Sequence, residues 1–126
     1  MIIIGHPWIK SKKFCKVFSI EDIKVSDTDD VVLLEPLADS NTHAQYCNEN
    51  DITFAVVVST LEDALFANAL GATYLVCEEA DALLIEPIAT EYLFDAQILV
   101  LITNQKEVSR IARGHIDGVI FAEAIV

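Results

Sequence analysis

The stretch that decides the fold runs from Thr53 to Phe121 and begins TFAVVVS-TLEDALFANALGA-TYLVC (53–77). It continues with EEADALLIEPIATEYLF (78–94), QILVLI (97–102), TNQKEVSRIARG (103–114) and HIDGVIF (115–121). Short runs rich in Val, Ile and Leu alternate with longer amphipathic runs. That alternation is typical of successive strand–helix units on a parallel sheet.

The same pattern extends toward the N-terminus. We expect strands at residues 1–4, 14–20 and 31–35, with a polar loop at 24–30. From residue 31 onward the expected strands start every 20 to 24 residues, and such regular spacing indicates repeated βα units. A chain of 126 residues has the length of one domain. We therefore predict one α/β domain over 1–126, with N-terminal strands and a basic segment in 1–24 and an acidic βα repeat in 25–126.

Three local signals refine the expected helices. Ser59-x-x-Glu62 has the form of a capping box that opens the helix after the strand at 53–58. Proline is comfortable in the first turn of a helix and costly further along, so we expect Pro87 to start a helix that runs to Phe94. Asn104, with a glutamate three residues later, forms a second cap pair.

Composition and cysteine usage bear on the compartment. Apolar residues make up 53% of the chain, yet no run approaches the roughly 18 apolar residues of a membrane helix. The N-terminus lacks the basic start and long apolar core of a secretory signal, so we expect a cytoplasmic protein. Cys15, Cys47 and Cys77 lie far apart, which favours small buried hydrophobes over disulfides.

The charge is unevenly distributed along the chain. Net charge is −12, and no Lys or Arg occurs from Val25 to Gln105. Nucleic-acid backbones and anionic membranes are bound through Lys and Arg, so neither is an expected partner. The basic segment from Lys10 to Lys16 faces an otherwise acidic body, and we expect it to favour association of two copies.

Two segments carry a resemblance to a known family. Ser59-Thr60-Leu61-Glu62-Asp63-Ala64, followed by Leu70-Gly71-Ala72-Thr73-Tyr74, resembles a strand–helix seam of phosphate-binding (βα)8 barrels. Ile116-Asp117-Gly118-Val119-Ile120-Phe121, then Ala124-Ile125-Val126, is similar to the last strand of those barrels. Thiamine-phosphate synthase, sugar-acid aldolase and indole-glycerol-phosphate synthase belong to this group. The resemblance covers roughly the second half of the chain.

The resemblance has consequences for fold and ligand. A complete barrel of eight βα units needs ~200 residues or more, so the chain is too short for one. We expect a truncated or open barrel-like, mainly parallel sheet, with a flavodoxin-like doubly wound sheet as the alternative. Those families grip phosphate with a Gly-Ser or similar pair after the last strand. Here that pair is Ala122-Glu123, and a carboxylate repels a phosphate dianion, so the phosphate motif is degraded.

Ligand-side residues follow from the expected topology. In parallel sheets, ligands bind at the carboxyl ends of the strands. The polar residues expected there are His6, Glu35, Ser59, Glu78, Asn104 and Glu123. No pair of them has a diagnostic metal-ligand spacing, so no metal and no cofactor is predicted. No lysine is expected at a strand end, which disfavours a Schiff-base aldolase. Glu78 also disfavours a thiolate at the neighbouring Cys77.

Two functions from different classes remain open. The absence of a recognisable catalytic motif favours a non-enzymatic domain that binds a small molecule or a partner and self-associates. The alternative is a lyase or isomerase related to the phosphate barrels, with Glu35 or Glu78 as general base. The sequence leans toward the first and leaves the identity of the ligand open.

Overall fold

Seven parallel strands form one continuous sheet in the computed structural model, which describes residues 1–126. Their order is β1-β7-β6-β5-β4-β3-β2, so every strand from β2 to β7 lies beside its neighbour in sequence. This is the order that successive right-handed βα units produce. The strands are β1 (Ile2–Ile4), β2 (Phe14–Lys16), β3 (Val31–Leu34), β4 (Phe54–Val57), β5 (Tyr74–Cys77), β6 (Gln97–Ile102) and β7 (Gly118–Phe121).

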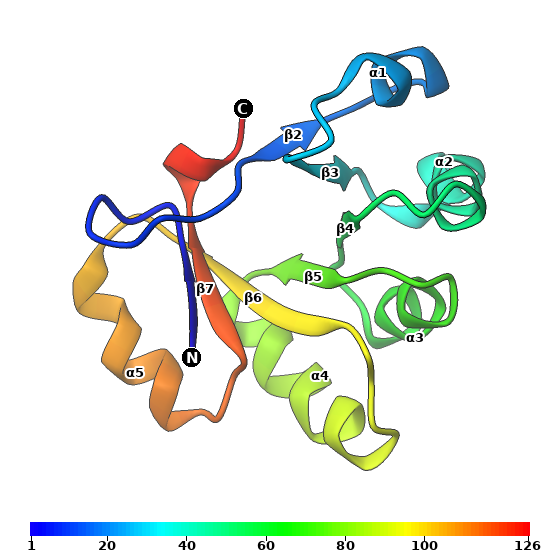
Figure 1. The fold of residues 1–126 in the computed structure, drawn as a ribbon. Coiled ribbons are helices and arrows are strands. Elements are labelled where there is room, and N and C mark those ends of the chain that lie inside the picture. The colour runs from blue at the N-terminus through cyan, green and yellow to red at the C-terminus, as the bar shows by residue number, and fades with distance from the viewer.

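The helices lie outside the curled sheet, on its convex face (Figure 1). They connect consecutive strands, and short 3-10 turns precede α5 and follow β7. The helical elements are α1 (Ile20–Val25), α2 (Leu37–Glu49), α3 (Leu61–Ala69), α4 (Glu79–Glu91), η1 (Gln105–Glu107), α5 (Val108–Arg113) and η2 (Ala122–Ala124). None of these helices has the length and apolar character that a membrane crossing needs.

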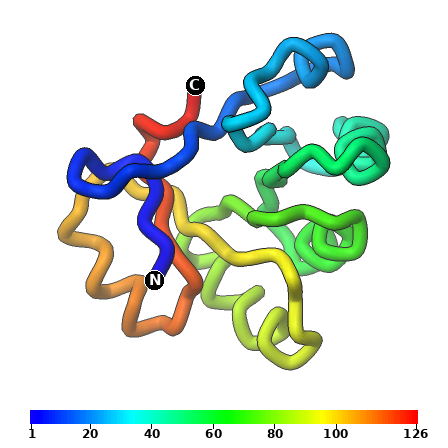
Figure 2. Tube along the Cα trace, viewed as in Figure 1, coloured from blue at the N-terminus to red at the C-terminus, as the bar shows by residue number.

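The C-terminus bridges the gap between the two ends of the curl. After β7 the chain turns through η2 and reaches β2, where Ile125 forms a parallel bridge with Phe14. The Val126 N–H donates to the Phe14 carbonyl at 2.9 Å, and the Lys16 N–H donates to the Val126 carbonyl at 3.0 Å. The tube in Figure 2 shows the C-terminal end beside the strand that follows the N-terminal loop. The predicted open, barrel-like sheet is confirmed, and the doubly wound alternative is not what the chain adopts.

Alternating side chains along the strands build two apolar layers. Val32 and Leu34 of β3 point outward and pack under the helices, in a cluster of 26 buried residues. Val31 and Leu33 point into the curl, as the period of two requires. Both faces of the sheet are therefore buried, which explains why its strands are almost wholly apolar. The inner cluster consists of Ile4, Phe14, Val31, Leu33, Ala55, Val76, Leu99, Ile120 and Ala124.

The helix predicted to start at Pro87 is wrong. Pro87 instead lies inside α4, which runs unbroken from Glu79 to Glu91. A proline inside a helix costs about 3 kcal/mol through a lost hydrogen bond and a clash. Burial of Ala82, Ile85 and Ala89 against the sheet offsets that cost. Tertiary packing therefore extends the helix by two turns before the proline.

Helix capping differs from the prediction in one place and agrees in another. The cap of α3 is Thr60, one residue after the predicted Ser59, and its Oγ1 accepts the Asp63 N–H at 3.1 Å. The predicted cap pair at Asn104 is confirmed. Its side chain accepts the Lys106 N–H at 2.9 Å, and its own N–H donates to Glu107 at 3.4 Å.

The predicted strand at 14–20 is shorter than expected. It ends at Lys16, and Ser19 caps α1 by accepting the Asp22 N–H at 3.1 Å. Part of the predicted loop at 24–30 is therefore the end of a helix.

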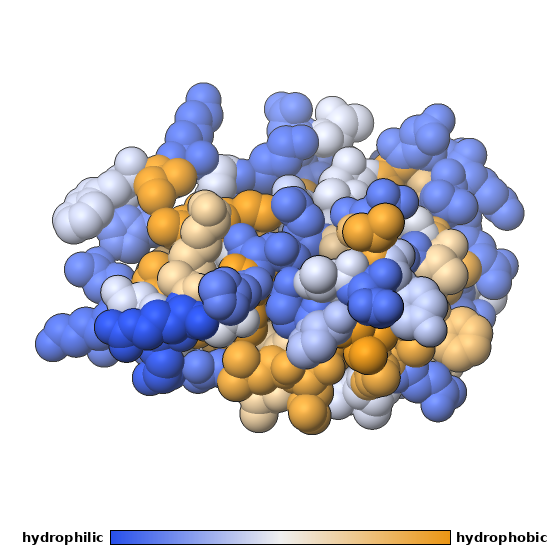
Figure 3. Space-filling model, turned by 90° about the horizontal axis from the view of Figure 1, so that it is seen from below, coloured by the Kyte–Doolittle hydropathy of each residue, from blue (hydrophilic) through white to orange (hydrophobic).

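The outer surface is not uniformly polar, because apolar side chains gather on the side where α4 lies (Figure 3).

Candidate ligand sites at the carboxyl ends of the strands

The carboxyl ends of the strands carry two hollows of opposite charge. One lies over β2 to β5 and is called the acidic hollow; the other lies over β1, β6 and β7 and is called the basic hollow. The predicted ligand-side residues divide between them and do not converge on one pocket. The acidic hollow contains Glu35, Ser59 and Glu78, and the basic hollow contains His6, Asn104 and Glu123.

The acidic hollow encloses about 420 Å³ above the apolar interior of the curl. Its floor comes from inward-facing residues of the strands, and its rim comes from the first residues after them. The lining contains three carboxylates, those of Glu35, Glu78 and Asp81, and one ammonium, that of Lys16. The lining comprises Lys16, Leu33, Glu35, Val57, Val58, Ser59, Val76, Cys77, Glu78, Asp81, Leu101 and Ile125.

The structure corrects one element of the chemistry expected from sequence. Lys16 is the last residue of β2 and lines the acidic hollow, so a lysine does lie at a strand end. Its place was not expected from the sequence, because the strand at 14–20 was predicted to continue to Ile20. Lys16 is exposed, whereas a Schiff-base lysine is desolvated. Asp81 was also missed, because α4 was expected to start later than it does.

Cys77 lies at the edge of the acidic hollow and is held as a neutral thiol. Burial raises the pKa of the Cys77 thiol to about 12, and the carboxylates of Asp81 and Glu78 act in the same direction. Burial likewise raises the pKa of Cys47 to about 11. A thiol with so high a pKa supplies almost no thiolate at neutral pH. The raised pKa disfavours a nucleophilic role for Cys77, whose side chain lines the hollow.

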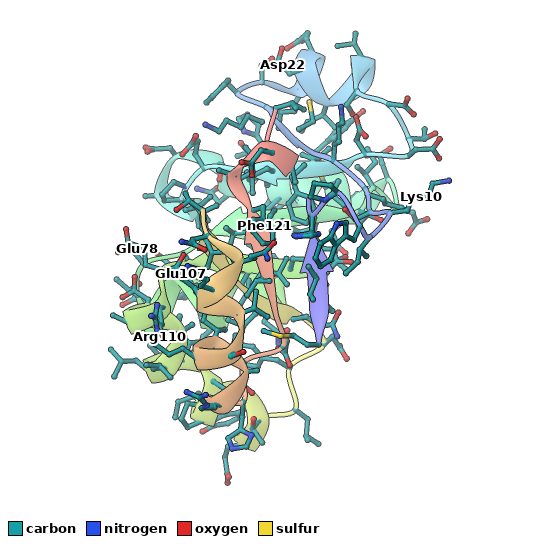
Figure 4. The ribbon with its side chains drawn as sticks, turned by 90° about the vertical axis from the view of Figure 1, so that its left-hand side faces the viewer. Lys10, Asp22, Glu78, Glu107, Arg110 and Phe121 are labelled. Atoms are coloured by element: carbon teal, nitrogen blue, oxygen red, sulfur yellow. The ribbon has the colours of Figure 1, made fainter.

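The basic hollow is larger, about 940 Å³, and more open to solvent. Most of its lining belongs to one segment, residues 5–13, which we call the basic loop. This loop connects β1 to β2 and carries Lys10, Lys12 and Lys13. In Figure 4, Lys10 projects from one side of the molecule, while Glu78 lies on the opposite side. The remaining lining residues are Thr103, Asn104, Gln105, Phe121, Glu123 and Ala124.

His6 holds the basic loop against the body of the domain. Its Nε2 lies 2.8 Å from Oε1 of Gln105, and its Nδ1 accepts the Trp8 N–H at 3.2 Å. A neutral imidazole with its hydrogen on Nε2 satisfies both contacts. The His6 ring also packs edge-on against Trp8 and Phe121, at centroid distances of 4.7 and 5.4 Å. His6 thus holds the basic loop in place and also lines the basic hollow.

The side chains of the two hollows do not assemble a metal centre. No group of three or more His, Cys, Asp or Glu side chains comes together in a metal-binding arrangement. Asn104 is already engaged as the cap of η1. Glu123 is exposed on η2, directly after β7.

Comparison with known proteins adds no relative. No protein-family model matches the chain, and no curated protein matches it significantly in sequence. The resemblance to phosphate-binding barrels therefore stays a prediction for the second half of the chain.

Proposed function

We propose that this domain is a binding protein whose acidic hollow takes a small organic cation with an apolar body. One observation carries the proposal: Glu35, Glu78 and Asp81 surround an apolar floor and face only one lysine. A volume of about 420 Å³ lies within the range of small-molecule sites. An amine held there gains carboxylate contacts, while its hydrocarbon part covers Val57 and its neighbours.

The geometry favours amines over anions. An anionic ligand would meet three carboxylates, and Lys16 alone does not balance them. Lys16 would instead orient a ligand that also carries a carbonyl or hydroxyl, since an ammonium donates hydrogen bonds. The floor belongs to the buried inner cluster and is already shaped in the free protein, so little ordering cost accompanies binding.

Calorimetric titration and thermal shift against a matched panel test the proposal. The panel pairs alkylamines, diamines and aromatic amines with alcohols of the same skeleton. We expect amines to raise the melting temperature and the corresponding alcohols to have little effect, because only the former are charged. The proposal fails if no amine at millimolar concentration shifts the melting temperature or the amide resonances around Ser59 and Glu78.

Charge-neutralising variants locate the site. Glu35→Gln and Glu78→Gln should each weaken amine binding roughly tenfold, since each removes one charge-assisted contact. Glu49→Gln is the matched control, because that carboxylate is exposed at the last turn of α2 and outside the hollow. Equal binding by all three variants and the wild type would place the ligand elsewhere.

A second candidate function, suggested by the position of Lys16, is a lyase or isomerase of the phosphate-barrel type. Its position at a strand end, beside Glu35 and Glu78, is the observation that favours this alternative. Sugar phosphates and Mg²⁺, Mn²⁺ or Zn²⁺ form the second arm of the thermal-shift panel. Stabilisation by a sugar phosphate, lost in Lys16→Met, would favour the enzyme over the amine-binding protein.

A further inference from the structure

The basic loop presents an unusual combination of exposed groups. Trp8 is 83% exposed, and Ile9 beside it is also exposed. Three lysines follow within the loop, and none of them forms an ion pair within the chain. Tryptophan is enriched at protein–protein interfaces, and positive charge around such a contact steers a partner of opposite charge.

The loop is fixed rather than loose. The contacts of His6 hold it at Gln105 and Trp8, and the Gly5 N–H donates to the Ser11 Oγ at 3.0 Å. A second turn within it is closed by the Ile9 N–H, which donates to the His6 carbonyl at 3.0 Å. A loop already ordered loses little conformational entropy when it binds.

A second surface, on the helices, has the complementary chemistry. We call it the helix face; it lies on neighbouring helices α3 and α4, where Phe66 is 60% and Leu84 is 72% exposed. Exposed carboxylates of Glu62 and Glu91 lie on the same helices and form no ion pair within the chain. Its exposed apolar residues are Leu61, Leu65, Phe66 and Leu84.

The two surfaces cannot meet within one molecule. The basic loop lies at one edge of the barrel and α3 at the opposite edge (Figure 1). We infer that copies of this chain associate head to tail, the basic loop of one copy binding the helix face of the next. Both surfaces expose apolar groups. Lysines accompany them on the basic loop and carboxylates accompany them on the helix face, so the two surfaces are complementary in charge.

The geometry of the contact determines the kind of assembly. Because the two surfaces differ, the interface is heterologous, and it leads to rings or open chains of copies. A contact made by one short loop buries less area than a standard interface, so we expect association in the micromolar range or weaker. The acidic hollow is not part of this interface and remains free for a ligand.

The single tryptophan makes the contact directly measurable. Trp8 is the one tryptophan in the chain, so tryptophan fluorescence, excited selectively over the three tyrosines, reports on the basic loop alone. We expect its emission to shift to the blue as protein concentration rises, with a parallel increase of molar mass in sedimentation. The double variant Leu65→Lys/Leu84→Lys, altered only at exposed positions of the helix face, should abolish both effects.

Mixing two defective variants tests the head-to-tail arrangement. The variant Trp8→Ala/Lys12→Glu keeps the helix face and lacks the fluorophore, whereas Leu65→Lys/Leu84→Lys keeps the loop. Each alone should be monomeric, and adding the first to the second should restore the blue shift and give a 1:1 complex. Phe18→Ala and Lys24→Glu are controls for an exposed aromatic and an exposed lysine elsewhere, and both should associate like the wild type.

Three outcomes would overturn the inference. The first is a wild-type protein that stays monomeric at several hundred micromolar. The second is a helix-face variant, folded by circular dichroism, that still shows the concentration-dependent shift. The third is a mixture of the two defective variants that forms no complex although each variant is folded.

Discussion

The acidic hollow and the basic hollow lie along the same edge of one sheet, yet they are built in different ways. The acidic hollow has a floor of buried strand residues such as Val76 and a rim of residues that directly follow strands. The basic hollow is formed largely by one loop laid across the ends of β1, β6 and β7. The first depends on the core of the domain, and the second depends on a few polar contacts.

The two hollows therefore differ in how firmly their lining side chains are held. A site built on strands is fixed by the packing that stabilises the whole fold, which suits selection of a small ligand. A site built on a pinned loop presents its side chains outward, which suits a contact with a protein surface.

The largest effect is expected where β1 meets β7. A Cβ on Gly118 would lie 2.5 Å from the Ile2 carbonyl oxygen, a backbone atom that cannot move aside alone. Gly118→Val should therefore lower the free energy of unfolding by about 3 kcal/mol or more. Urea denaturation measures the loss, and hydrogen exchange should show β1 and the basic loop opening while β3 to β5 stay protected.

Gly114 supplies the matched control for that substitution. A Cβ there would meet the end of the Leu83 side chain at 2.9 Å, and that side chain is exposed and able to turn away. Gly114→Ala should cost far less than Gly118→Val. Equal losses would mean that the close approach of β1 is not what fixes the basic side of the sheet.

A pH-dependent effect is expected on the acidic side. Because burial raises the pKa of Cys77 to about 12 from an ordinary value of 9.0, its neutral thiol favours the folded state. This contribution is fully present below pH 9 and is lost as pH rises toward 12, since the unfolded chain ionises first. Cys77→Ala should reduce the alkaline loss of stability by about 2 kcal/mol at pH 11.

The reactivity of the thiols gives an independent check on the same point. At pH 8 a disulfide reagent should leave Cys77 and Cys47 unmodified in the folded protein, because both are buried neutral thiols. Cys15→Ala serves as the control, since it removes the one half-buried cysteine. Rapid labelling of Cys77 in the native state would show that the acidic hollow is more open than the structure describes.

A smaller effect is expected from loosening the basic loop. Gln105→Ala removes the 2.8 Å contact to His6 and should cost about 1 kcal/mol. The Trp8 amide, which donates to the same imidazole, should exchange faster while amides of β4 keep their protection. Gln97→Ala changes an exposed glutamine elsewhere and should alter neither rate. An unchanged Trp8 exchange rate would mean that His6 does not fix the loop.

The smallest effect lies outside both hollows. Burial raises the pKa of Glu86, the nearby Asp117 carboxylate adds to this, and one carboxylate oxygen has no hydrogen-bond partner. The stabilising contribution of the neutral acid is present below about pH 4.5 and is lost as pH rises through the folded pKa. Glu86→Gln should therefore raise the melting temperature by about 2 °C at pH 7 and leave it unchanged at pH 4.

The sequence predicted the architecture better than the limits of its elements. Strand runs such as QILVLI and the regular βα spacing indicate a parallel, barrel-like sheet, because buried strands must be apolar on both faces. Local rules failed where packing outweighed them, as at Pro87, which lies within a helix held on the sheet by Ile85. A one-residue shift at Thr60 and a shortened β2 are boundary errors of the same kind.

The sequence indicated which polar residues follow strands, but not how they are arranged in space. Polar residues that follow strands, such as Glu35 and His6, were expected at the carboxyl edge, and the structure places them there. Their division into two hollows of opposite charge depends on where residues 5–13 lie, and no local pattern specifies the path of that loop. The presence of Lys16 in the acidic hollow was not predictable either, because its position depends on where β2 ends.

By itself, the sequence determined the strand–helix alternation, the charge segregation and the set of polar residues at strand ends. Periodicity and charge are properties of neighbours along the chain, so they can be read without coordinates. Only the tertiary structure decided that the C-terminus closes on β2 and that Cys77 is buried beside the acidic hollow. It also placed the basic loop and the helix face on opposite edges. Those facts depend on contacts between residues far apart in sequence, such as Phe14 with Ile125.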